Sequence, residues 1–245
     1  MTAYYYKRGG GANRRFLFRI LALVLVILGI SMAGYVSFPL FSWHIYFDPV
    51  FASQDITAPI PKTTIVTEET IKSLKFWASQ MANGVDYKDA QNWFPSYQNK
   101  ESNQSAIKVE RYNLSIPALG IKEAIVSTTD YDLNHHLVHY PGTSLPPQNG
   151  NAVIFGHSTL PQLFNPNDYA TIFANAYKLR INDEIIATLE GVSYRYKVKT
   201  IFVVDPTDTS VFSQNFDGSY LTLVTCTPPG TTWKRLIIRG RLVPI

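Results

Sequence analysis

The sequence predicts an all-β domain, either a closed β barrel or a sandwich, that follows a single N-terminal transmembrane helix. Through residues 107–243, short segments rich in β-branched and aromatic residues alternate with Gly, Pro, Asn and Asp turns. These segments do not alternate with helical ones, so a parallel sheet flanked by helices is not expected. A long uncharged stretch near the N-terminus predicts the helix.

The uncharged stretch runs from Ile20 to Val36 and reads ILALVLVILGISMAGYV. Apolar residues on both sides extend it past the roughly 20 residues that a helix needs to span a bilayer. We therefore expect a transmembrane anchor over residues 20–41. A cleaved signal peptide is the alternative, but the apolar core is longer than in such peptides and no clean A-x-A site follows it.

The charges around this anchor predict its orientation. Five basic residues precede the first acidic residue, Asp48, and they are Lys7, Arg8, Arg14, Arg15 and Arg19. The positive-inside rule then places residues 1–19 in the cytoplasm and the rest of the chain outside. The rest of the chain contains the other 17 of the 22 basic residues and all 18 acidic ones, so its charges nearly balance. The composition therefore gives no support for nucleic-acid binding.

Residues 42–105 are predicted to be an extracytoplasmic linker. Residues 48–66 contain three prolines and no sustained periodicity, which is typical of an extended segment. One amphipathic helix is predicted over residues 67–81, because its apolar residues recur at a spacing of three to four. We hypothesise that this helix docks on the following domain. Residues 83–105 are polar apart from three aromatic residues and either pack on that domain or connect to it.

Seven strands are predicted in the domain that we assign to residues 106–245. Their ranges are 107–119, 123–128, 151–158, 183–191, 194–204, 220–226 and 235–243. Seven or eight strands in a domain of this size favour a closed barrel or a sandwich, since both protect the edges of their sheets. Residues 166–179 could hold a short helix in a crossover.

The only cysteine, Cys226, ends the segment YLTLVTC. Alternation along the strand places Thr222, Val224 and Cys226 on one face. Pro228 and Pro229 cannot continue a central strand, so the strand is expected to end at or just after the cysteine. Cys226 is then either a buried small hydrophobe or a nucleophile at the mouth of a barrel.

A nucleophilic thiol needs a base, because a free cysteine is mostly protonated at neutral pH. Among the five histidines only His157 directly ends a predicted strand, in NAVIFGHS. Arg235 follows Cys226 after a loop of eight residues, a spacing that suits two antiparallel neighbours. Its guanidinium could donate hydrogen bonds to an oxyanion. Arg239 has the same parity but lies about 13 Å further along an extended strand.

Together these segments resemble the sortase family of bacterial transpeptidases. The resemblance rests on TLVTC at residues 222–226, on Arg235 in WKRLII, on NAVIFGH ending at His157 and on HYPGTSLPPQNGN at 139–151. It covers residues 107–243 and implies an eight-stranded barrel with short helices. It also implies roles for three residues: Cys226 as nucleophile, His157 as general acid/base and Arg235 as oxyanion or substrate-positioning group. Thr225, Val224 and Thr227 are the expected substrate contacts.

The resemblance further implies a reaction and its partners. Sortases cleave a sorting signal of the Leu-Pro-x-Thr-Gly type between Thr and Gly and hold the Thr as a thioester. An amine of a peptidoglycan precursor or of a pilin lysine then resolves it. We therefore expect signal-bearing surface proteins, an amine acceptor and the bilayer as partners, in the bacterial cell membrane, with no metal or cofactor. Some pilin-assembling sortases carry a lid with an Asp-Pro-aromatic motif, but DPVF at 48–51 resembles it only loosely, so a spacer is favoured.

Two other functions remain open from the sequence. One is a membrane-anchored, non-catalytic β domain that binds a cell-surface ligand and contains an inert Cys226. The other is a membrane-tethered cysteine peptidase that releases its product to water. The loop TPPGTTWK at 227–234 is short and proline-rich, so the substrate contacts of sortases with a longer loop are not carried over. Asp130 and Asp132 are assigned to a turn rather than to a calcium site.

Overall fold

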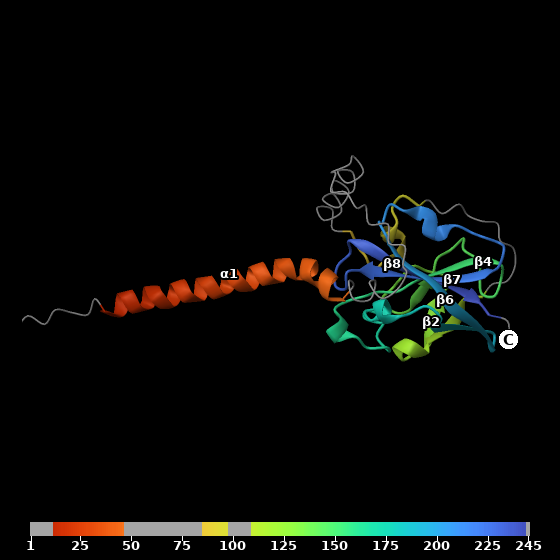
Figure 1. Cartoon of the computed structure of the whole chain (residues 1–245), viewed down its shortest axis with the longest axis horizontal. Coiled ribbons are helices and arrows are strands. Elements are labelled where there is room, and N and C mark those ends of the chain that lie inside the picture. Colours follow the sequence, from red (N-terminus) through yellow and green to blue (C-terminus); the bar gives the residue numbers. More distant parts are fainter. Residues whose placement is uncertain (1–11, 47–84, 98–108, 244–245) are drawn as a thin grey trace, which may run out of the picture.

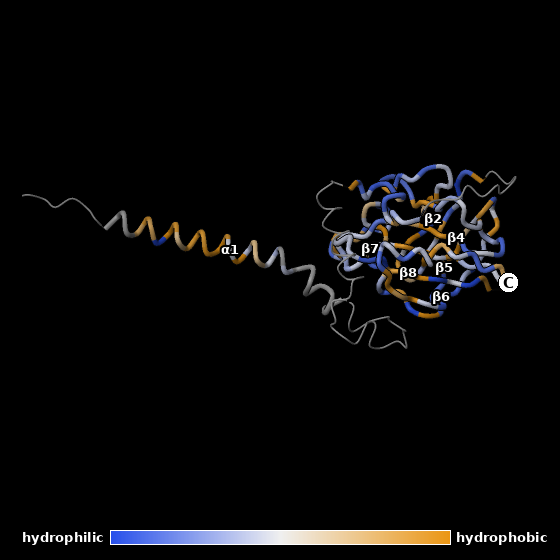
Figure 2. Tube along the Cα trace, turned by 90° about the horizontal axis from the view of Figure 1, so that it is seen from above, coloured by the Kyte–Doolittle hydropathy of each residue, from blue (hydrophilic) through white to orange (hydrophobic). Residues whose placement is uncertain are grey.

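The first segment that the structure describes is a single long helix. The computed structural model describes residues 12–46, 85–97 and 109–243 (Figure 1). Helix α1 spans Ala12–Tyr46, and its stretch Phe16–Tyr35 is the one helical segment of the described residues that is long and apolar enough to cross a membrane. The apolar side chains of this stretch are exposed. Figure 2 shows the stretch as a largely hydrophobic part of the helix. Such a surface is unfavourable in water and fits a bilayer.

After this helix in the sequence, eight strands form a closed barrel. Their order around the barrel is β1-β2-β3-β4-β7-β8-β6-β5. The strands are β1 (Arg111–Ile116), β2 (Ile121–Ser127), β3 (Leu137–His139), β4 (Gly150–Phe155), β5 (Glu184–Leu189), β6 (Val192–Val204), β7 (Ser219–Thr227) and β8 (Lys234–Leu242). Closure leaves no free sheet edge, which confirms the barrel rather than the sandwich.

Each of the seven predicted ranges overlaps one observed strand, and the eighth strand, β3, has only three residues. Three residues are too few to show the alternation from which a strand is predicted. The pairs β2/β3 and β4/β7 are parallel, whereas the other neighbours run antiparallel. The crossover between residues 166 and 179 contains one short 3-10 helix, Ala176–Lys178, where a short helix was expected.

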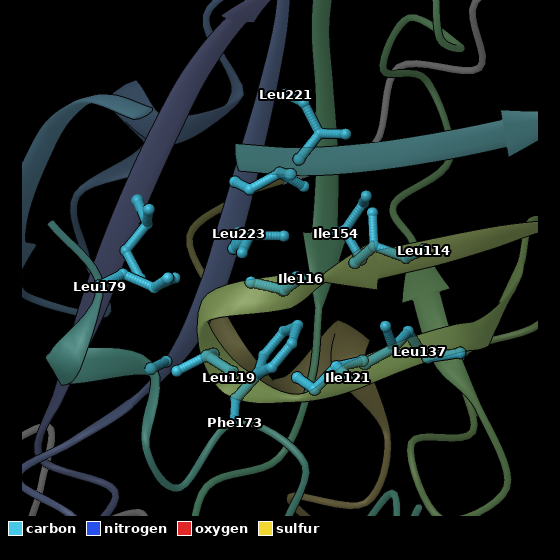
Figure 3. Close-up of a cluster of buried hydrophobic side chains, with 14 of the residues drawn as sticks. Leu114, Ile116, Leu119, Ile121, Leu137, Ile154, Phe173, Leu179, Leu221 and Leu223 are labelled. Carbon is cyan, nitrogen blue, oxygen red and sulfur yellow. The ribbon is translucent and has the colours of Figure 1, made fainter. Parts of the chain in front are cut away.

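The barrel interior is filled by alternate side chains of the strands. Leu221 and Leu223 of β7 point into it together with Ile154 of β4 and Leu114 of β1 (Figure 3). All four are fully buried or within 1% of it. Their side chains are removed from water, and this burial is the main stabilising contribution to the barrel.

A second apolar cluster, the outer cluster, lies on the other face of the same strands. Its barrel members include Phe155 of β4, Val224 and Cys226 of β7, and Ile237 of β8. The odd and even residues of β7 thus divide between two buried faces, which explains why β7 is buried at eight of its nine positions. Cys226 belongs to the outer cluster and not to the barrel interior.

A buried histidine is expected to make the barrel sensitive to acid. His139 accepts or donates at Nδ1 with the Tyr112 hydroxyl (2.9 Å) and at Nε2 with Thr143 Oγ1 (3.1 Å). Burial lowers its pKa from 6.5 to about 4. The unfolded chain therefore takes up a proton at His139 near pH 6.5, whereas the folded chain takes it up only near pH 4. The free energy of unfolding is therefore highest above pH 6.5 and decreases as the pH falls from 6.5 to 4.

We expect that loss to be about 3 kcal/mol, from roughly 1.4 kcal/mol per unit of pKa difference. Chemical denaturation at pH 7 and at pH 4.5 measures it. His139→Gln, whose amide does not titrate, should be less stable at pH 7 but lose less stability on acidification. An equal loss in both proteins would assign the acid sensitivity to other groups.

Candidate active site

Three neighbouring strands bring the predicted catalytic residues to one end of the barrel. Cys226 of β7 pairs directly with Arg235 of β8. In the parallel β4/β7 pair Phe155 lies opposite Val224, so His157, two residues further on, reaches the level of Cys226. Because side chains two apart share a face, all three side chains lie on the outer face of the barrel.

The turn that carries His157 depends on a glycine. A Cβ atom at Gly156 would lie 2.5 Å from the ring of Phe173 and 2.7 Å from Leu137. Glycine therefore lets the end of β4 pass close to the crossover. The Phe173 N–H donates to the His157 carbonyl (3.0 Å), which fixes the histidine main chain from the crossover side.

Residues 85–97, which we call the cover, lie over this end of the barrel. Their backbone is tied to the turn after β2, since Ala90 N–H donates to the Tyr131 carbonyl (3.0 Å) and Leu133 N–H to the Lys88 carbonyl (2.9 Å). The short 3-10 helix Ala90–Trp93 begins at Asp89, whose carboxylate caps it. The sequence favoured a spacer for residues 48–105, but the part of that region that the structure describes packs on the barrel.

Aromatic side chains of the cover complete the outer cluster. Trp93 and Phe94 are fully buried. Phe94 meets Phe155 and Phe212 edge to face, with ring centroids 5.9 and 5.1 Å apart, and Tyr97 stacks on Phe212 at 3.8 Å. Trp93 contacts the ring of His157, with centroids 5.8 Å apart. The cover therefore closes the site over the histidine and the cysteine, and Cys226 is only 6% exposed.

Arg235 is buried beneath the cover with its charge compensated by carbonyl groups and aromatic faces. Its Nη1 donates to the carbonyls of Thr232 (2.8 Å) and Lys234 (3.1 Å), and its Nη2 donates to the Trp93 carbonyl (3.1 Å). The Trp93 ring lies 5.2 Å from the guanidinium carbon. Among the described residues no acceptor meets its Nε, so one donor of a buried cation is left for another oxygen.

Burial shifts the thiol and the imidazole toward their neutral forms. It raises the pKa of Cys226, and the positive charge of Arg235 only partly opposes this. It also lowers the pKa of His157, against the opposite influence of Asp132 and Asp86, while Lys88 lowers it further. Both directions favour a neutral thiol beside a neutral imidazole while the cover is in place.

The structure also places the other residues singled out from the sequence. Val224 lies in the outer cluster, Thr225 donates its hydroxyl to the Gly156 carbonyl (2.8 Å), and Thr227 is fully buried with no partner for its hydroxyl among the described residues. Arg239 pairs with Thr222, four residues from the Cys226–Arg235 pair, and donates to the Thr222 hydroxyl (3.0 Å). The helix predicted over residues 67–81 and the DPVF segment lie outside the described residues.

The cover residues are the part of the site that sequence reasoning missed. Trp93, Phe94 and Tyr97 were noted only as apolar exceptions in a polar stretch. That contrast is a usable signal, because three large aromatic residues in a polar segment need a partner surface. The pattern alone did not decide whether these residues pack on the following domain or only connect to it.

The barrel and the residues at its end belong to a known class of enzymes. The family model of the sortase domain matches residues 114–243, so the chain belongs to the sortase family of transpeptidases. It is similar to Sortase D of Bacillus subtilis (strain 168), with 26% identity over 231 residues, 92% of this chain and 98% of that protein.

Two solved sortase structures are similar to this chain to different degrees. Sortase C-1 from Actinomyces oris is 24% identical and covers 73% of this chain and 100% of its own, with a TM-score of 0.52, which shows a shared fold. A Clostridium perfringens Sortase D5 transpeptidase is 30% identical over 55% of this chain and 79% of its own, with a TM-score of 0.46. The family and the exposed apolar helix α1 fit a membrane-anchored protein.

Arg235 is expected to act through its planar, forked guanidinium as well as through its charge. Arg235→Lys keeps the charge but loses the fork, so we expect kcat/KM for peptide ligation to fall by about tenfold. Arg239→Lys is the matched control on the same face of β8 and should leave the ligation rate close to that of the wild type. Steady-state ligation of a sorting peptide to triglycine compares them. A loss confined to Arg239→Lys would assign the role to Arg239 instead.

Proposed function

We propose that this sortase-family protein cleaves a Leu-Pro-x-Thr-Gly-like sorting signal through a thioester on Cys226 and transfers the acyl group to an amine. The main support is the strand register, which places Cys226 opposite Arg235 and level with His157. The physiological result would be attachment of surface proteins to the cell wall or assembly of pili. The acceptor would be a peptidoglycan precursor or a pilin lysine.

The proposed reaction consists of two acyl transfers. The Cys226 sulfur attacks the Thr carbonyl carbon of the signal, and the oxyanion that forms accepts hydrogen bonds from Arg235. The C–N bond to Gly then breaks, and the departing amine takes a proton from the His157 imidazolium. In the second step an incoming amine attacks the thioester and gives a proton to His157. The sulfur leaves, and a new amide bond is formed.

The neutral resting pair has a consequence for this sequence of steps. Attack requires a thiolate and an imidazolium, but burial under the cover disfavours both. Movement of residues 85–97 would expose the thiol to the signal and restore water and charge around the pair. The cover is therefore proposed to open before acylation.

Intact-mass spectrometry tests the proposed function. The full chain in detergent micelles is incubated with a panel of Leu-Pro-x-Thr-Gly-like peptides, with and without triglycine. We expect a covalent adduct whose mass equals the acyl fragment and a new amide product when triglycine is present. A product that is only the free acid would indicate a cysteine peptidase. No adduct with any peptide would favour a non-catalytic binding domain.

We also propose that residues 1–19 are cytoplasmic, that residues 20–41 cross the membrane and that the barrel is extracytoplasmic. The basic residues before the apolar stretch support this orientation. An epitope tag placed after Ile245 should be accessible to a membrane-impermeant antibody on intact spheroplasts. Access only after permeabilisation would reverse the proposed orientation.

A further inference from the structure

Two hydroxyl groups join β4 and β7 at the point where their regular pairing ends. The last backbone bond of this region runs from Gly156 N–H to the Val224 carbonyl (3.2 Å). Beyond it the Thr225 hydroxyl donates to the Gly156 carbonyl (2.8 Å), and the Ser158 hydroxyl donates to the Cys226 carbonyl (2.7 Å). One bond lies immediately before His157 and the other immediately after it. The first is donated by β7 and the second by the segment that follows β4.

In a regular parallel pair these two carbonyls would accept from backbone N–H groups. Here side-chain hydroxyls donate to the two carbonyls in place of backbone N–H groups, so the two segments remain connected where the regular pairing of β4 and β7 ends. Together with the bond from Phe173 N–H to the His157 carbonyl, they hold three consecutive residues, 156–158, in place. The two hydroxyl bonds thus fix the main chain of the histidine relative to the main chain of the cysteine.

The contacts of the imidazole ring itself do not provide the same fixation. The aromatic contact of His157 in the described residues is with Trp93, which belongs to the cover. That contact is lost whenever the cover moves. The bond from Ser158 to Cys226 lies within the barrel and connects the two predicted catalytic residues whether or not the cover is present.

From this geometry we infer that Ser158 is a positioning residue that holds His157 in register with Cys226 during catalysis. The inference rests on the proposed function, in which the two residues exchange protons. An error of about an ångström in such a pair can reduce the rate by up to about a hundredfold. Ser158 is only partly buried, whereas Thr225 is 2% exposed, so Ser158 can be changed with less disturbance of the barrel.

The first test compares ligation kinetics of the full chain in detergent micelles. For Ser158→Ala we expect kcat to fall about tenfold with KM for the sorting peptide unchanged and the same melting temperature as the wild type. Ser158→Thr keeps the hydroxyl and should restore the rate. Ser115→Ala is the matched control, because the Ser115 hydroxyl also bonds to a backbone group (Glu123 N–H, 2.9 Å) but lies on β1. It should leave kcat unchanged.

The second test does not depend on ligation. Cys226 is the only cysteine in the sequence, so alkylation by iodoacetamide between pH 5 and pH 10 reports on this thiol alone. The charges near the pair, Asp86, Lys88, Asp132 and Arg235, are the same in the variant. We expect alkylation near neutral pH to be slower in Ser158→Ala, because a displaced imidazole stabilises less of the minor thiolate–imidazolium form that reacts with the reagent.

The outcomes separate the two proposals. A wild-type protein that ligates no peptide, with a shifted alkylation profile in Ser158→Ala, would overturn the proposed function and retain the positioning role. Normal kcat and an unchanged alkylation profile in Ser158→Ala would overturn the positioning role. So would a loss of rate that Ser158→Thr does not restore and that is accompanied by a lower melting temperature, since this describes a structural contact.

Discussion

Replacing His157 by alanine is expected to lower the rate of ligation by about 10²–10⁴-fold, and replacing Cys226 by alanine is expected to abolish the covalent adduct altogether. In the proposed mechanism, loss of Cys226 leaves no atom to hold the acyl group. In the same mechanism, loss of His157 leaves the departing amine without its proton donor and the thiol without its base. Intact mass after incubation with a sorting peptide and triglycine measures both effects.

His139→Ala does not serve as a control for His157→Ala, because His139 is buried in a hydrogen-bond network and its loss is expected to destabilise the barrel. His135→Ala is the better control. His135 is largely exposed and bonds only to Asp132 (2.8 Å) in the described part of the chain. If the Cys226→Ala variant ligated peptides at the wild-type rate, Cys226 would be excluded as the nucleophile, since the sequence contains no second cysteine.

The pairing of Cys226 with Arg235 could be predicted because it is local. A strand that ends at paired prolines, a short loop and a second strand define an antiparallel neighbour, and the register follows from the loop length. The structure shows this pairing directly. The register of β4 with β7 is different, because about 70 residues separate the bonded groups and no periodicity specifies which strand lies beside which. The pattern alone selected His157 as a strand-end histidine, and the resemblance to the family predicted that it lies beside Cys226.

The position of the cover could not be predicted from the sequence either, because its contacts join residues that are even further apart in the chain. Trp93 is connected to Arg235 across 142 residues, and its burial depends on the closed barrel already being present. Its segment has no strand alternation and contains only one 3-10 turn. The eight-stranded barrel, in contrast, follows from many short segments that each carry their own alternation. Where burial depends on a distant surface rather than on local periodicity, the sequence indicates only that an apolar group needs a partner.

Trp93→Ala is expected to increase the alkylation rate of Cys226 on the order of 100-fold. Removing a buried tryptophan costs about 3–5 kcal/mol, and here much of that loss is borne by the docking of residues 85–97 rather than by the barrel. The fraction of molecules with an exposed thiol then rises. Reduced burial also lowers the pKa of Cys226 and raises that of His157, so the thiolate–imidazolium pair becomes more populated and the rate rises further.

Phe202→Ala is the matched control, because Phe202 packs against the same outer cluster but stacks on Arg239 and not on the residues proposed to be catalytic. It should lower the melting temperature without a comparable rise in alkylation. A sorting peptide should protect Cys226 in Trp93→Ala at lower concentrations than in the wild type, since it no longer has to displace Trp93 from Arg235. Equal alkylation rates in Trp93→Ala and the wild type would mean that reagents reach the thiol without movement of residues 85–97, and that the cover does not control access to the site.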